Sequence, residues 1–156
     1  MKQIIVGPDA DQHVRAFMCQ ILGNPTGFQA GRGLGMVEKL PDDMARIRAG
    51  VWYENFNGAN MMMHIASDGT KAWMTREYLW YAFFYPFVEC GCKRVTALVA
   101  ASNTDSRLFC ERVGFSTEAT LQDAAADGDM IVYRMFRDEC RWLKLRERGA
   151  INRRIH

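Results

Sequence analysis

The sequence lacks a long hydrophobic run and a Cys-x-x-Cys pair, and both absences limit what the protein can be. No apolar stretch reaches the roughly 18 residues that a membrane span needs. The longest candidate, Tyr78 to Val88, contains Pro86. The N-terminus carries no signal-peptide pattern. These absences predict a protein that stays in the cytoplasm and has no membrane partner.

The five cysteines are an odd number, and none stands at metal-ligand spacing with the three histidines. Structural zinc sites need four closely spaced Cys or His ligands. We therefore expect no metal, and we interpret the cysteines as reduced, buried thiols.

Charge is unevenly distributed along a chain of 156 residues whose net charge is only +2. From Arg137 onward there are seven basic residues and three acidic ones, so this segment has a net charge of +4 and the rest of the chain has a net charge of −2. A basic end can meet an anion, a nucleic acid or only water. The sequence predicts one domain over residues 1–148 and a basic C-terminal tail over 149–156.

The hydrophobic pattern predicts an alternating order of strands and helices. Strands are expected at 2–6, 35–40, 46–56, 60–66, 94–100, 115–121 and 130–136. Helices are expected at 9–22, from Thr75 to Gly91 with a kink or tighter turn at Pro86, at 103–113 and at 138–148. Residues 24–34, with Gly31 and Gly33, are expected to form a loop, and Asn57-Gly58 a tight hairpin turn. This order predicts a mixed, mostly antiparallel α/β (α+β) sheet of about seven strands with helices on both faces.

Two segments resemble the GNAT superfamily of N-acetyltransferases. In the stretch from Arg94 to Phe115 a strand leads to Asn103 and a helix ends at Gly114-Phe115, and residues 128–135 resemble the family's last strand. The runs 73–76, 85–87 and 139–143 are similar to small acetyltransferase-like proteins of bacteriophages and prophages, which would place the protein in the host cytoplasm.

The resemblance implies acetyl transfer from acetyl-CoA to an amine by direct attack in a ternary complex. The donor's pantetheine arm would lie between two parted strands, and its pyrophosphate at the start of the following helix, where free N–H groups favour anions. The donor-binding residues implied are Ile65, Ala66, Ser67, Trp73, Thr75, Arg76, Asn103, Ser106, Arg107 and Phe109. Lys71 would add charge.

The sequence departs from the family at two points. Residues 67–74 lack the family's glycine-containing phosphate loop, and Cys110 occupies the position of a proton-donating tyrosine. The candidates for the general base are His64 and Glu54, and the candidates for the acid are Cys110 and Tyr53. Each of the four also has a plausible packing role.

Three interpretations remain open at this stage. The first is transfer to a small-molecule or protein amine. The second is a phage enzyme that acylates a nucleobase amino group, with DNA contacted by the basic tail. The third is a CoA-binding or partner-binding protein without catalysis. The resemblance also suggests a homodimer.

Overall fold

The computed structural model describes residues 1–23, 28–70 and 72–148. Its elements, in chain order, are β1 (Lys2–Ile5), α1 (Pro8–Leu22), β2 (Gly31–Lys39), β3 (Ala45–Glu54), β4 (Asn60–Ser67), α2 (Arg76–Phe84), a π-helical turn (Tyr85–Glu89), β5 (Arg94–Ala100), α3 (Thr104–Val113), β6 (Ser116–Ala125), β7 (Gly128–Phe136), and two 3₁₀ segments (Arg137–Glu139 and Arg141–Arg148). The tail expected over 149–156 lies outside the described residues.

No helix within these described ranges combines the length and the apolar character needed to cross a bilayer.

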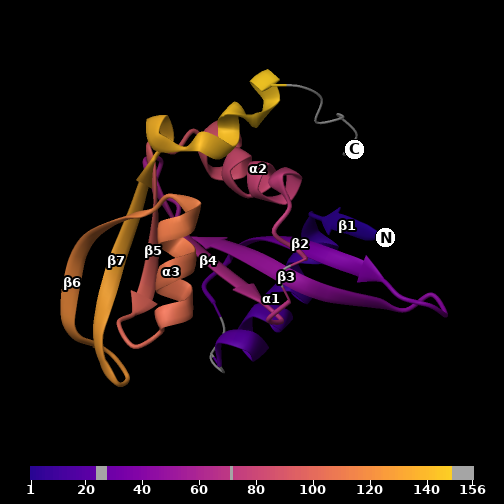
Figure 1. Ribbon diagram of the computed structural model, residues 1–156, viewed down its shortest axis with the longest axis horizontal. Coiled ribbons are helices and arrows are strands. Elements are labelled where there is room, and N and C mark those ends of the chain that lie inside the picture. The colour runs from indigo at the N-terminus through magenta and orange to yellow at the C-terminus, as the bar shows by residue number, and fades with distance from the viewer. Residues whose placement is uncertain (24–27, 71, 149–156) are drawn as a thin grey trace.

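The strands form one seven-stranded sheet in the order β1-β2-β3-β4-β5-β7-β6. Every neighbouring pair is antiparallel except β4 and β5, which run parallel. Helices α2 and α3 lie on one face of the sheet and α1 lies on the other (Figure 1). The expected mixed sheet with helices on both faces is confirmed.

Two separate apolar clusters hold the helices to the sheet. The larger one joins α2 and α3 to alternate residues of the strands, among them Val51, Met63 and Val95. The smaller one lies under α1 and contains Val14, Met18, Trp52 and Ala66. Because side chains alternate along a strand, odd-numbered residues of β3 and β4 face α2, and even-numbered ones face α1.

The glycine-rich run from Gly31 to Gly35 is part of β2, so the expected loop over 24–34 is wrong for its second half. These glycines are needed because α1 packs directly on the strand. A Cβ atom at Gly33 or at Gly35 would stand 2.9 Å from Val14 of α1, and one at Gly35 would also meet Ile5 of β1 at 2.8 Å. The carboxylate of Asp11 on α1 also accepts the Gly33 N–H at 2.7 Å, which ties the helix to the strand.

Three further expectations were wrong in detail. Pro86 does not tighten the end of its helix; the chain widens there into a π-helical turn, because proline supplies no N–H for the normal α-helical bond. The final segment is 3₁₀ rather than α-helical. The β3–β4 loop spans five residues, since Asn57 bonds through its side chain to the N–H groups of Ala59 and Asn60 instead of forming a two-residue turn.

Replacing Gly33 with alanine should destabilise the protein by about 1–3 kcal/mol, the usual cost of overpacking a core. The new methyl group would meet Val14 at 2.9 Å and push α1 away from β2. Urea unfolding measures the loss, and Ala119→Ser, at an exposed strand position, is the control. Equal midpoints for Gly33→Ala and the original protein would contradict this account of the glycine run.

Candidate functional site

A groove opens where β4 and β5 part. The two strands pair at only three positions, Asn60–Arg94, Met61–Val95 and Met62–Thr96. Each continues beyond that point, because β4 remains paired with β3 and β5 with β7. The groove between them is lined by Leu22, Met63, His64, Ile65, residues 97–100, Asn103, Ser106, Phe109, Cys110 and Phe115.

A polar contact marks the point where the strands part. Thr96 is buried, and its hydroxyl donates to Asn60 Oδ1 at 2.7 Å, which joins β5 to β4 through side chains. Beyond Met62 the edge of β4 that faces β5 has no strand partner. A free strand edge can accept an extended ligand through backbone hydrogen bonds.

His64 and Glu54 form a pair beside this groove. His64 Nε2 lies 2.9 Å from Glu54 Oε1, and Glu54 is 8% exposed. The pair forms because the β3–β4 register sets Trp52 opposite His64 and Glu54 opposite Met62, so both side chains are on the α1 face. A carboxylate that accepts from one imidazole nitrogen fixes the orientation of the ring. The two candidate bases are thus one unit.

The segment after α1 supports this pair, and the sequence did not indicate its role. The Phe28 ring packs against the His64 ring with centroids 4.8 Å apart. The Gln29 N–H donates to Glu54 Oε2 at 2.8 Å, while Trp52 Nε1 donates to the Gln29 carbonyl. Phe28, an aromatic residue at the edge of a Gly- and Pro-containing segment, was the only local signal.

Known structures share the overall fold. One is the spermidine/spermine N-acetyltransferase SpeG from Vibrio cholerae, at 12% identity with a TM-score of 0.66, covering 96% of this chain and 100% of that one. Another is a GNAT-family acetyltransferase from Bacillus anthracis, at 13% identity with a TM-score of 0.64, covering 88% and 96%. The fold is that of the GNAT acetyltransferases. No family model matches the sequence, nor does any curated protein. The resemblance to phage proteins therefore stays a prediction.

Helix α3 supplies the second wall of the groove. Asn103 caps the helix, with its side chain accepting from the Ser106 N–H, and both residues line the groove together with Phe109. Cys110 is buried in the wall, and this burial raises the pKa of its thiol to about 12. Cys110 is therefore protonated at neutral pH and is a weak acid.

Other candidates lie away from the groove lining. Tyr53 faces the α2 core, where its hydroxyl donates to the Ala82 carbonyl at 2.6 Å and burial raises its pKa well above the usual value. Arg107 turns inward, with Nη1 bonded to the Ala101 carbonyl and Nε 3.4 Å from Tyr133. Ala66 is buried beneath α1. Only Ile65 and His64 of the expected β4 residues line the groove.

The turn after β4, expected to hold the donor's phosphates, uses its amides internally. The Gly69 N–H donates to Ser67 Oγ, and the Thr70 N–H donates to Asp68 Oδ1 at 3.0 Å. Thr75 caps α2 by accepting the Tyr78 N–H, while Trp73 is buried against Phe109. These residues do not form an open anion cradle. Among the expected phosphate contacts, Arg76 is exposed at the helix start, and Lys71 lies outside the described residues.

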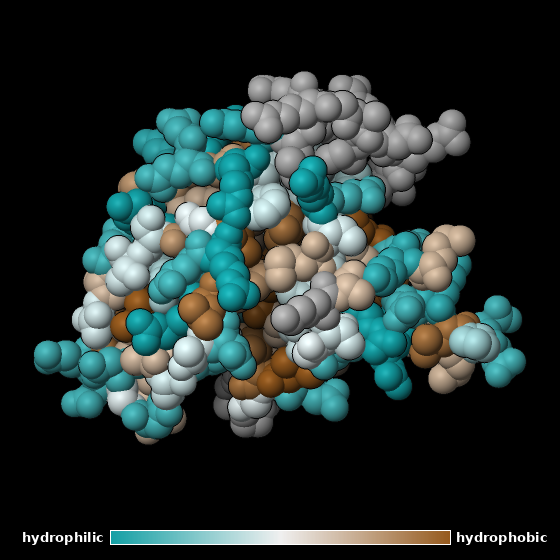
Figure 2. Space-filling view, viewed as in Figure 1, coloured by the Kyte–Doolittle hydropathy of each residue, from teal (hydrophilic) through white to brown (hydrophobic). Residues whose placement is uncertain are grey.

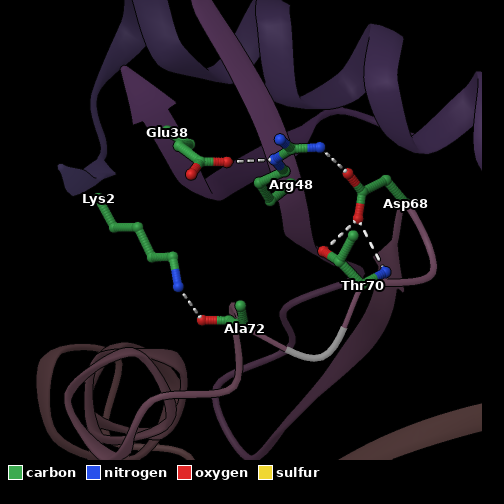
Figure 3. Close-up of polar contacts among 6 residues, drawn as sticks. All are labelled: Lys2, Glu38, Arg48, Asp68, Thr70 and Ala72. Atoms are coloured by element: carbon green, nitrogen blue, oxygen red, sulfur yellow. Dashed lines mark hydrogen bonds and ion pairs between the residues drawn. The ribbon is translucent and has the colours of Figure 1, made fainter. Parts of the chain in front are cut away.

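An ion-pair network holds this turn to the sheet (Figure 3). Arg48 on β3 bridges Glu38 at 2.7 Å and Asp68 at 2.8 Å, and Lys2 donates to the Ala72 carbonyl. Burial alone would raise the pKa of Asp68, but hydrogen bonds from Thr70 and Arg48 lower it to about 2. Asp68 therefore remains negative, which further disfavours phosphate at the turn.

Asp68→Asn should destabilise the protein at pH 7 and reduce its sensitivity to acid. A depressed folded pKa stabilises the fold above the unfolded pKa near 4, and this contribution is lost as the pH falls towards about 2. Urea midpoints between pH 6 and pH 2.5 should fall more steeply for the original protein than for the variant. Asp43→Asn, at an exposed turn, is the control, and equal slopes for all three proteins would contradict the assignment.

Proposed function

We propose that the protein is an N-acetyltransferase that moves an acetyl group from acetyl-CoA to an amine. The observation that supports this most directly is the pairing of His64 with Glu54 at a groove between parted parallel strands. The groove offers a strand edge for an extended donor, and the pair offers a base for the acceptor. Both are present in a chain whose fold is shared with acetyltransferases.

In this proposal the donor approaches from the face that carries α2 and α3. Apolar side chains line a central hollow on that face, framed by polar ones (Figure 2). The pantetheine arm would extend along the free edge of β4 from Met63 onward, opposite Ser106 and Phe109 of α3. Backbone bonds to the strand edge then fix the thioester in one orientation, and orientation supplies much of the rate in such transfers.

The acceptor amine attacks the thioester carbon from the opposite face, where His64 lies. As the C–N bond forms, the amine nitrogen loses a proton to His64, and Glu54 stabilises the resulting imidazolium. The tetrahedral intermediate collapses by breaking the C–S bond, which gives an amide and the CoA thiolate. No covalent enzyme intermediate is needed.

Cys110 does not serve as the proton donor in this scheme. Its thiol pKa of about 12 exceeds that of an ordinary thiol by several units, so proton transfer from Cys110 to the leaving thiolate would be unfavourable. The thiolate takes its proton from solvent instead. Cys110 then acts as an apolar wall beside the donor.

The closed turn after β4 supports a second candidate, a donor-binding protein without catalysis. A helix start whose neighbouring amides are already bonded binds phosphate less well than an open one. In contrast, the nucleobase alternative loses support. Arg141, one of its basic residues, donates to the Arg112 carbonyl at the end of α3 and packs on Trp142.

Acetyl-CoA should bind and stabilise the protein, by about 2.7 kcal/mol at a hundred times its Kd. Acetyl-pantetheine, which lacks the nucleotide, should bind more weakly than acetyl-CoA, but by less than roughly tenfold. A single charge-assisted hydrogen bond contributes about that factor. Arg76→Glu should remove the difference in affinity between the two ligands. Arg46→Glu, at an exposed position near the start of β3, is the control and should leave that difference unchanged. Calorimetry measures the affinity of both ligands for the original protein and for each variant. No binding of acetyl-CoA at millimolar concentration would reject the proposed function.

His64→Ala should lower kcat by roughly 100-fold or more, the usual contribution of a positioned base, while donor affinity stays the same. Glu54→Gln should have a smaller effect, because the imidazole remains but its orientation weakens. Tyr53→Phe is the control: it should lose about 1 kcal/mol of stability and keep its activity. Free thiol release and product mass are the measurements. Unchanged kcat in His64→Ala together with donor binding would favour the non-catalytic candidate.

A further inference from the structure

One half of the sheet is uncovered on the face that carries His64. Helix α1 packs against β2, β3 and β4 there, and no described helix covers β5, β7 and β6 on that side. The register sets Leu98 beside Val132 and Ala119 in one row, and Met130 beside Leu121 in the next. We call these five residues the apolar platform. Leu98 is 38% exposed and Leu121 is 44% exposed.

The apolar platform is continuous with the groove. Leu98 belongs to both, since it also lines the groove. Because Met62 pairs with Thr96 where β4 and β5 run parallel, even-numbered residues of β4 and β5 face the same side. His64 and Leu98 therefore lie on one face, on the two sides of the gap between the strands. An acceptor whose nitrogen reaches His64 would rest its remaining atoms on the platform.

The charges around this surface limit what the acceptor can carry. None of the residues that line the groove is acidic. Glu118 is paired with Arg94, and Glu139 lies 3.6 Å from Arg134, so these two carboxylates already have cations. At the β6–β7 turn, Asp127 accepts from Ser102 Oγ and Asp129 accepts from the Asp123 N–H. Residues 24–27, 71 and 149–156, which lie outside the described ranges, contain no Asp or Glu in the sequence. A second ammonium group on the acceptor would find no free carboxylate in this lining.

We infer that the acceptor is a primary monoamine with an apolar or aromatic substituent, which lies across the apolar platform with its nitrogen at His64. The inference rests on the proposed function. Burial of an apolar substituent against Leu98 and Val132 removes apolar surface from water and so favours its binding. A polyamine would gain little there and would leave ammonium groups unpaired beside Arg94 and Arg134.

The test compares 2-phenylethylamine, ethylamine and spermidine as probes with the full-length protein. Each is measured for kcat/KM with acetyl-CoA, and for direct binding by calorimetry. We expect kcat/KM for 2-phenylethylamine to exceed that for either other amine by roughly tenfold or more, the factor expected when a hydrophobic pocket gains a few methylene equivalents. Spermidine equal to or better than 2-phenylethylamine would overturn the inference.

Leu98→Glu provides the matched variant, since the residue is exposed and lies on a strand that is paired along its whole length with β7. It should weaken 2-phenylethylamine binding by roughly tenfold and strengthen that of spermidine. Leu108→Glu, at an exposed position of α3 outside the groove lining, is the control and should change neither. Unchanged amine binding in Leu98→Glu would overturn the platform as the acceptor surface.

The acceptor preference and the acetyltransferase activity can be tested separately. If acetyl-CoA binds and is turned over with spermidine as the preferred acceptor, the inference is wrong and the proposed function stands. If acetyl-CoA does not bind, the proposed function falls. In that case the direct binding of 2-phenylethylamine and its loss in Leu98→Glu still support or reject the platform.

Discussion

The limited pairing of β4 with β5 is the constraint on which the rest of the site depends. Three residue pairs join the strands, and Thr96 reinforces the junction through Asn60. Beyond it each strand stays extended because its other edge is paired, β4 with β3 and β5 with β7. Two strands can therefore part without leaving the sheet, and the unpaired edges become a groove with a rigid backbone on both sides.

In the proposed reaction the two faces of the sheet have different roles, one for the donor and one for the acceptor. Alternation along β4 sends Met63 into the core beneath α2 and His64 towards α1. A donor lying on the α2–α3 side and an acceptor on the α1 side meet only at the gap. The base belongs to the acceptor side because deprotonation concerns the amine, and Glu54 is held there by the Gln29 N–H.

The turn after β4 shows how a shared fold can carry a different ligand site. In a helix start that binds phosphate, the amides are open. Here Ser67 and Asp68 bond to those of Gly69 and Thr70, and Arg48 holds Asp68 ionised. The same contacts that hold this turn take up two of the N–H groups that an anion would need. Fold similarity to SpeG therefore does not by itself establish how this chain recognises a donor or an acceptor.

Local rules in the sequence determined the order of elements, the caps at Thr75 and Asn103, the end of α3 at Gly114 and the mixed sheet, because periodicity and capping depend on near neighbours. Only the tertiary structure decided that residues 31–34 belong to a strand, where Val14 of α1 lies against Gly33 and leaves no room for a side chain. The pairing of His64 with Glu54, and the separation of Tyr53 from both, likewise follow from β3–β4 register, which brings together residues ten positions apart. Local pattern identifies residue types able to do chemistry, and long-range register decides which of them meet.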